Sequence, residues 1–207
     1  MPAKNERVIV YIDGFNLYFG LRDKGWTKYY WLDLHRLSLS LLAPNQTLVR
    51  TKYFTSKIST PADKRKRQEA YLSALGTLPD FEMHFGRYQT YEQACRNCGH
   101  KHLDSNEKRT DVNIATHLLV DAFQGNFDTA ILMSADSDLT APLQEINRLF
   151  PQLLVKVAFP PGRFSLELQN AARVSFQVYE GKLRKSLLPS SVKLPSGYVV
   201  QRPTRWT

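Results

Sequence analysis

Short apolar runs alternate with stretches of helical periodicity along most of the chain. An apolar run of four to eight residues is too short for a helix and predicts a buried strand. Largely apolar runs occur at residues 7–12, 129–133 and 153–159. Residues 48–55, 81–88 and 175–179 mix apolar and polar side chains and are also predicted to be strands. Apolar residues at helical spacing, bounded by Pro or Gly, predict helices between them. These helices begin at 17–21 and cover 31–42, 61–78, 110–124, 139–150 and 164–173, with one more helical turn at 181–186.

The alternation of strands and helices predicts an α/β fold, with a doubly wound and mostly parallel sheet under helical layers. Residues 91–106 are polar, interrupt this alternation and are interpreted as an insert. Beyond Pro189 the chain is rich in Pro, Ser and basic residues, a composition typical of a mobile tail. We therefore expect one domain over residues 1–180 and a basic C-terminal extension over 181–207.

Acidic side chains follow two of the predicted strands directly. Asp13 ends the run at 7–12, and Asp136 and Asp138 follow the run at 129–133. Ligands of open parallel sheets bind outside the carboxyl ends of the strands, so these carboxylates are expected at the functional edge. The plainer interpretation is that one of the last two, such as Asp138, caps the next helix.

The predicted helix at 110–124 supplies another acid. Asp111 lies on the same face as its apolar stripe. A buried carboxylate is costly unless it is paired or bound to metal, which favours Asp111 pointing toward Asp13 and Asp136 across the rim of the sheet. Interaction with the first helical turn is the alternative. Asp121 lies about 15 Å further along the helix axis and is excluded from the site.

Four carboxylates, with Asn16 as a neutral oxygen donor beside them, therefore form a predicted metal site. The four are Asp13, Asp111, Asp136 and Asp138. Clustered carboxylates repel one another unless a divalent cation neutralises them, and oxygen-only ligands with open positions suit Mg²⁺ or Mn²⁺. Such a site orients a phosphate and lowers the pKa of a bound water. The chain has no G-x-x-x-x-G-K-[ST] loop, G-x-G-x-x-G loop or G-x-S-x-G turn, so nucleotide-triphosphate, dinucleotide and α/β-hydrolase chemistry lack support.

Three blocks of sequence resemble the motif blocks of the NYN domain family, relatives of the PIN-domain nucleases. The blocks are VIVYIDGFNLYFGL, EKRTDVNIATHLLVDA and DTAILMSADSDLTAPL, in the family's order over about residues 7–179. The resemblance implies a PIN-like, Rossmann-like three-layer fold with five or six parallel strands. It also implies a metal-dependent ribonuclease site at Asp13, Asn16, Asp111, Asp136 and Asp138. Ser134 matches the family's Ser in the pattern S-G-D-S-D, and Ala135 stands where that pattern has Gly.

Basic residues outnumber acidic ones by 28 to 19, a net charge of +9. Most of the excess, +6, falls within residues 160–207. This balance predicts a partner with many phosphates. The resemblance to the NYN family implies that this partner is RNA, and we expect it to be single-stranded. Candidate contacts to phosphate are Lys64, Arg65, Lys108, Arg109 and Arg163, and candidate base-stacking side chains are Tyr88, Tyr91 and Phe164. For the basic cluster at 64–67 a solvated helix face is the alternative.

Two cysteines form a C-x-x-C pair in the predicted insert. A zinc site needs four ligands, so Cys95 and Cys98 would need His84, His100 or His102, or ligands from a second chain in a homodimer. Two reduced thiols in a surface loop, or a redox pair, are the alternatives. With no secretory signal and no apolar run of membrane-spanning length, we expect a reducing cytoplasm and no membrane partner.

Taken together, these features predict a cytoplasmic, Mg²⁺- or Mn²⁺-dependent endoribonuclease. One alternative is a non-catalytic module on the same fold that binds RNA or a protein. Another is a metal-dependent phosphohydrolase or DNA nuclease. The set of Asp residues favours an enzyme over a binding module, and the basic charge favours a polymer over a small phosphate ester.

Overall fold

A computed structural model describes residues 5–94, 98 and 101–206 of the chain. For residues 88–94 and 101–108 the description covers the backbone. No helix in the described part of the chain combines the length and the apolar character that a membrane crossing requires.

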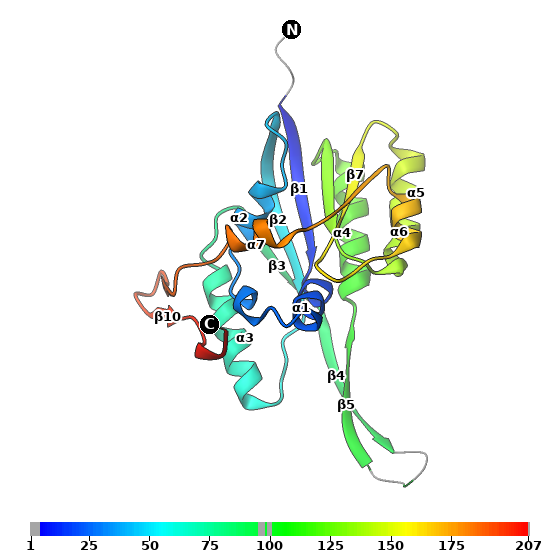
Figure 1. The fold of residues 1–207 in the computed structure, drawn as a ribbon. Helices are drawn as coiled ribbons and strands as arrows, with labels where there is room; N and C mark the ends of the chain where they lie inside the picture. The colour runs from blue at the N-terminus through cyan, green and yellow to red at the C-terminus, as the bar shows by residue number, and fades with distance from the viewer. Residues whose placement is uncertain (1–4, 95–97, 99–100, 207) are drawn as a thin grey trace.

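Six parallel strands form the central sheet, as the sequence predicted (Figure 1). Their order across the sheet is β3-β2-β1-β6-β7-β8. The strands are β1 (Glu6–Asp13), β2 (Gln46–Thr55), β3 (Phe81–Phe85), β6 (Thr129–Met133), β7 (Leu154–Phe159) and β8 (Val174–Gln177). From β1 the chain proceeds to β2 and β3 on one side, and later to β6, β7 and β8 on the other. The strand order therefore reverses between β1 and β6, and ligands of such sheets bind at this switch point.

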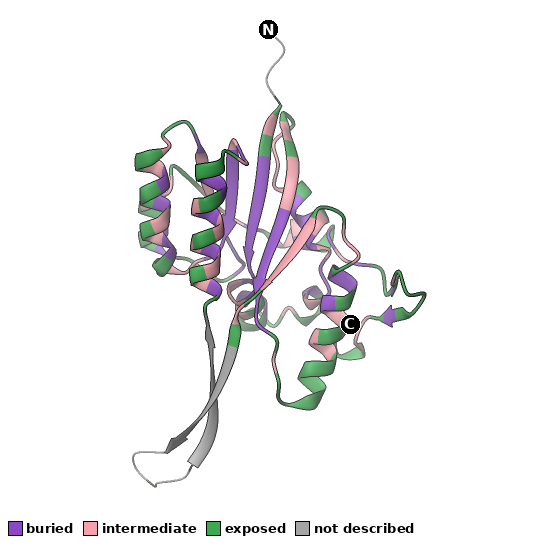
Figure 2. Cartoon of the chain, turned by 180° about the vertical axis from the view of Figure 1, so that it is seen from behind, coloured by how far each residue is buried: buried purple, intermediate pink, exposed green. Residues whose placement is uncertain are grey.

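Helices cover both faces of the sheet, so its central strands are buried over most of their length (Figure 2). Successive β1 residues alternate between the two cores: Val8, Val10 and Ile12 join one, and Ile9 and Tyr11 join the other. The first core includes side chains of α1 (Gly14–Asp23), α2 (Leu34–Ser40), α3 (Ala62–Leu75) and α7 (Glu180–Arg184). The second includes those of α4 (Thr110–Gln124), α5 (Thr140–Leu149) and α6 (Leu166–Ala171). Burial on both faces explains why these strands read as nearly continuous apolar runs.

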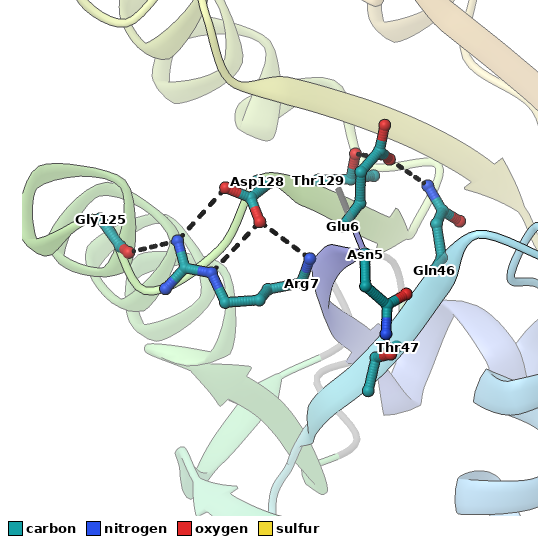
Figure 3. Close-up of polar contacts among 8 residues, drawn as sticks. All are labelled: Asn5, Glu6, Arg7, Gln46, Thr47, Gly125, Asp128 and Thr129. Atoms are coloured by element: carbon teal, nitrogen blue, oxygen red, sulfur yellow. Dashed lines mark hydrogen bonds and ion pairs between the residues drawn. The ribbon is translucent and has the colours of Figure 1, made fainter. Parts of the chain in front are cut away.

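Helix α4 runs from the carboxyl edge of the sheet to its amino edge. At its end Arg7, near the start of β1, donates from Nη2 to the carbonyl of Gly125 at 2.9 Å (Figure 3). The same side chain pairs with Asp128, whose Oδ2 also accepts from the Arg7 backbone N–H at 2.8 Å. These contacts fix the end of α4 at the amino edge. The first turn of α4, which carries Asp111, therefore lies at the opposite, carboxyl edge.

The predicted insert is an antiparallel hairpin of β4 (Arg87–Ala94) and β5 (Lys101–Lys108). It projects beyond the carboxyl edge of the sheet (Figure 1). The strand predicted at 81–88 was too long, because β3 leaves its pairing with β2 at Phe85 and the chain enters the hairpin at Arg87.

The prediction of a mobile tail beyond Pro189 was wrong. The segment contains β9 (Ser191–Lys193), β10 (Val199–Gln201) and a 3₁₀ helix, η3 (Thr204–Trp206). Val192 and Val200 are buried in a third cluster with Trp31, against which Trp206 packs. A few well-spaced apolar side chains anchor the segment, although its composition is dominated by polar and basic residues.

Candidate active site

The carboxylate of Asp13 is the centre of the polar network at the switch point. Strand β1 carries it to the carboxyl edge, where it caps α1: its Oδ1 accepts from the backbone N–H groups of Phe15 and Asn16, each at 3.0 Å. Gly14 permits the close approach of β2 to this turn, because a Cβ there would lie 2.7 Å from both the Phe54 carbonyl and the Tyr53 hydroxyl. The first acid of the site is thus fixed by the turn that follows β1.

Asn16 and Ser134 join the turn after β1 to the turn after β6. Oδ2 of Asp13 accepts from Asn16 Nδ2 at 2.7 Å and from the Ser134 hydroxyl at 2.8 Å. Ser134 in turn accepts from the backbone N–H of Asp136 at 3.1 Å, and Asn16 Oδ1 accepts from the Ala135 N–H at 3.3 Å. Two distant segments of the chain therefore form one hydrogen-bonded unit around a single carboxylate.

The electrostatics of this unit favour a cation. Asp13 is only 5% exposed, and burial raises the pKa of its carboxyl. Hydrogen bonds from Asn16 and Ser134 act to lower that pKa, while the negative charge of Asp136 raises it further. Burial disfavours the ionised form of Asp13, and a second ionised carboxylate nearby repels it. A bound cation would offset both effects.

The four predicted carboxylates do not form one cluster. Asp136 is half-buried and caps the 3₁₀ helix η2 (Ser137–Leu139), its Oδ1 accepting from the Asp138 N–H at 3.1 Å. The cap that the sequence suggested for Asp138 thus belongs to Asp136, while Asp138 is exposed. Asp111 is half-buried in the first turn of α4. Within the described residues, no three Asp, Glu, His or Cys side chains are grouped closely enough to hold a metal ion.

The pair Asp13 and Asp136 nevertheless suits one particular kind of cation. Mg²⁺ takes oxygen ligands, keeps several of its waters, and is commonly bound through one or two carboxylates plus the phosphates of the substrate. Such a site needs no complete protein cage. The donor set, oxygen only and with a raised carboxyl pKa at its centre, therefore fits a Mg²⁺ or Mn²⁺ ion that binds together with a phosphate.

Replacing Asp13 by alanine is expected to lower the free energy of unfolding by about 2 kcal/mol. The change removes the cap of α1 and leaves the donors of Asn16 and Ser134 unpaired, although relief of the buried charge offsets part of the loss. Asp138→Ala makes the same change of charge at an exposed position and serves as the control. Urea unfolding of both variants in EDTA measures the difference. Equal losses in the two variants would contradict the network around Asp13.

The residues predicted to contact RNA differ in their exposure and in their ion pairs. Lys64 and Arg65 lie at the exposed start of α3, where Arg65 also pairs with Glu69 at 3.5 Å. Arg163 is half-buried and pairs with Asp23 at 3.1 Å. Arg109 immediately precedes α4 in the left-handed region, with a φ of 82°. The side chains of Lys108, Tyr88 and Tyr91 lie outside the described residues, and Phe164 is exposed beside Phe159.

Of the predicted zinc ligands, the structure describes two side chains. Cys98 is exposed and follows β4, at the far end of the hairpin. His84 lies in β3, before the hairpin begins, stacked on Phe54 with 4.8 Å between ring centroids. The eight residues of β4 span on the order of 25 Å between these two positions. Cys95, His100 and the side chain of His102 are outside the described residues, and the zinc site stays a prediction.

Tyr53 is a residue of this region that the sequence did not reveal. It lies near the carboxyl end of β2, with its hydroxyl against Gly14. Burial raises the pKa of this phenol to about 12, the negative charge of Asp13 also raises it, and a hydrogen bond with Thr55 opposes them. Its place in a predicted strand could have suggested burial, but only the pairing of β1 with β2 brings it beside Asp13.

A six-stranded parallel sheet with carboxylates at its switch point is the architecture of a Rossmann-like α/β protein. Residues 7–180 match the family model of the NYN domain, and the chain belongs to this family. The resemblance noted in the sequence is thereby confirmed.

The chain is similar to a relative in sequence and to a solved structure in fold. A relative from Pseudomonas putida (strain DSM 28022 / S16), named 6-hydroxy-3-succinoylpyridine 3-monooxygenase HspA, is 31% identical over 176 residues. The match covers 68% of this chain and 55% of the relative, so the chain spans about half the length of that protein. The structure of a protein of unknown function, VPA0982 from Vibrio parahaemolyticus RIMD 2210633, superposes with a TM-score of 0.57 at 19% identity. The superposition covers 91% of this chain and 99% of the Vibrio protein, and it shows that the two share a fold.

Proposed function

We propose that the protein is a metal-dependent endoribonuclease that cleaves phosphodiester bonds of single-stranded RNA at the switch point of its sheet. The observation that carries the proposal is the buried carboxylate of Asp13, hydrogen-bonded through Ser134 to the turn that holds Asp136. Membership of the NYN family, a PIN-like nuclease family, supports this chemistry. The net charge of +9 supports a polyanionic substrate.

Each residue of the network has a distinct role in this proposal. Asp13 and Asp136 would hold Mg²⁺ or Mn²⁺, with Asp111 and Asp138 at the same edge of the sheet. When bound, such an ion offsets the charge of a phosphate and lowers the pKa of a coordinated water. Asn16 and Ser134 donate to Asp13, which fixes the orientation of its carboxylate and favours its ionised form.

The purified protein is expected to cleave a single-stranded RNA in Mn²⁺ or Mg²⁺ and to leave it intact in EDTA, because without the ion nothing lowers the pKa of the attacking water or offsets the developing charge of the phosphate. Gel electrophoresis of an end-labelled RNA, in parallel with the DNA of the same sequence, measures the products. A cut within the strand, rather than loss of terminal nucleotides, marks an endonuclease.

The same assay separates the alternatives. RNA that is bound but never cut with either ion would indicate a non-catalytic binding module. Cleavage of the DNA strand alone, or hydrolysis of p-nitrophenyl phosphate without cleavage of RNA, would indicate a DNA nuclease or a phosphohydrolase. Each of these outcomes would overturn the proposal.

A second candidate function is the oxygenation of a small aromatic acid. The Pseudomonas putida relative is named for such a substrate, and a cavity of about 560 Å³ beside Asp13 is lined by eight aromatic side chains and four Lys or Arg residues. A monooxygenase transfers one atom of O₂ to its substrate and reduces the other to water with electrons from a donor. Incubation with 6-hydroxy-3-succinoylpyridine, isotopically labelled O₂ and a reduced nicotinamide, followed by mass spectrometry for a pyridine product that carries the label, with or without the succinoyl group, tests this candidate.

A further inference from the structure

An aromatic cavity lies directly beside the candidate active site, and neither the carboxylates nor the NYN fold accounts for it. It has a volume of about 560 Å³ and is walled by residues of α1, β2 and α3, the 3₁₀ helix η1 (Thr27–Tyr30) and η3. Its exposed or half-buried rings include Tyr18, Tyr30 and Trp206. This volume is within the usual range for small-molecule and cofactor sites, roughly 300–1,000 Å³.

The charge of the cavity wall has one sign. Arg22, Lys64, Arg67 and Arg205 line it, and no Asp or Glu occurs among its described lining residues. Lys64 and Arg67 lie on successive turns of α3, and within the described residues neither forms an ion pair, unlike Arg65 with Glu69. Arg22, by contrast, pairs with Asp23 at 3.3 Å. The cavity therefore combines flat apolar surfaces with the unpaired positive charges of Lys64 and Arg67, a combination that suits an aromatic ring carrying an anionic group.

The cavity adjoins Asp13 through the turn that follows it. Gly14 and Phe15, the next two residues of the chain, line the cavity, as does Tyr53. The hydroxyl of Tyr53 lies against Gly14, and the charge of Asp13 contributes to the raised pKa of this phenol. A ligand in the cavity would thus lie next to whatever binds at Asp13.

One wall is built by the segment beyond the NYN domain. Trp206 and Arg205 lie outside the matched residues 7–180. The ring of Trp206 packs 5.7 Å from Tyr30 and 6.1 Å from Tyr71 between centroids. The segment is held by β9 and β10 and by Trp31, whose Nε1 donates to the Pro189 carbonyl at 2.8 Å. The C-terminal extension therefore completes the cavity.

We propose that this cavity binds one nucleotide of the RNA strand, next to the phosphodiester bond held at Asp13. The base lies against the rings of Tyr18, Tyr30 and Trp206, and a flanking phosphate is held by Lys64 and Arg67. Stacking on aromatic rings accepts every base, so the site fixes the position of the strand more than its sequence. This inference rests on the proposed ribonuclease function and adds a substrate-positioning site to it.

Binding of a short, fluorescein-labelled oligouridylate in EDTA, where cleavage is not expected, tests the site by anisotropy. Tyr18→Ala and Trp206→Ala are expected to weaken binding roughly ten-fold each, because each removes one stacking surface. Tyr179→Ala, which removes a ring that is 72% exposed and does not line the cavity, is expected to bind like the parent. Tyr18 is on α1 and does not anchor the C-terminal segment, so its variant remains informative if Trp206→Ala loosens that segment.

A matched pair of lysines tests the phosphate contact. Lys64→Gln is expected to weaken binding several-fold and to reduce the slope of log affinity against log salt by about 0.7. Lys66→Gln removes the same charge from the same helix, but Lys66 does not line the cavity, and it is expected to keep the parent's slope. Equal effects of the two changes would show a diffuse attraction and would overturn the phosphate contact.

Cleavage assays in Mn²⁺ with the same variants separate this inference from the proposed function. If the parent cuts RNA and Tyr18→Ala and Trp206→Ala bind and cut equally well, the inference is overturned and the function stands. If binding depends on the cavity but the parent never cuts, the function fails and the nucleotide site stands. If 6-hydroxy-3-succinoylpyridine binds the parent and RNA does not compete with it, the cavity is a site for a small aromatic acid and the nucleotide assignment is overturned.

Discussion

Asp136→Asn is expected to slow RNA cleavage by at least about a hundred-fold while leaving the protein as stable as the parent in EDTA, or more stable. The amide keeps the side-chain oxygen that accepts from the Asp138 N–H, so the cap of η2 is retained. It removes the negative charge that raises the pKa of Asp13, and with it a repulsion that no cation offsets in EDTA. Activity and stability therefore change in different directions.

Thermal melts of parent and variant, in EDTA and in Mn²⁺, measure the stability part of this prediction. A ligand that binds only the folded state raises the melting temperature according to its affinity, so the parent should gain more from Mn²⁺ than Asp136→Asn. Glu145→Gln, a change of the same kind on the exposed face of α5, should cut RNA like the parent. A variant that melts lower than the parent in EDTA and gains equally from Mn²⁺ would assign Asp136 a structural role alone.

Asp121→Asn is expected to lower the free energy of unfolding by about 3–5 kcal/mol without involving the active site. Lys52 of β2 and Asp121 of α4 form a buried ion pair, with 2.6 Å between Nζ and Oδ2 and side-chain exposures of 9% and 6%. Tyr11 and Asn126 also donate to this carboxylate. Removal of its charge leaves the Lys52 ammonium buried without a counter-charge, which is costlier than the loss of one hydrogen bond.

The double variant Lys52→Met/Asp121→Asn is the control for this explanation. It removes both charges, and the asparagine oxygen still accepts from Tyr11, so much of the lost stability should return. Denaturant unfolding of the parent, both single variants and the double variant gives the coupling between the two sites. A double variant no more stable than Asp121→Asn would show that the cost comes from packing and not from the unpaired ammonium.

The pH dependence of the pair has a definite sign. Burial of Asp121 acts to raise its pKa, but hydrogen bonds from Lys52, Tyr11 and Asn126 outweigh it, and the pKa is lowered below the ordinary 3.8. A carboxyl with a lowered folded-state pKa contributes stability above its unfolded pKa and loses it as the pH falls through the folded one. The contribution of Asp121 is therefore expected to be complete at neutral pH and to vanish only in acid below about pH 3.8.

The sequence alone determined the architecture, because the patterns that specify it are short-range. In the run RVIVYI, Val8, Val10 and Ile12 pack in one core and Ile9 and Tyr11 in the other. This alternation is the period of two that a strand imposes on its side chains. The helical stripe of α4 is equally local, and its predicted bounds agree with the observed Thr110–Gln124. A carboxylate directly after a strand must lie at the carboxyl edge of a parallel sheet, so the positions of Asp13 and Asp136 followed from the order of the elements.

The contacts between elements were decided by the tertiary structure, since they depend on how distant segments pair. Ser134 meets Asp13 across 121 positions of the chain, and Lys52 meets Asp121 across 69, because β1 lies between β2 and β6 and α4 packs over them. The local pattern indicated that one of Asp136 and Asp138 would form a cap, and the structure shows that it is Asp136. The composition of residues 190–206 indicated a mobile tail, yet Val192, Val200 and Trp206 anchor it, because burial of a few large side chains against Trp31 outweighs the polarity of the residues around them.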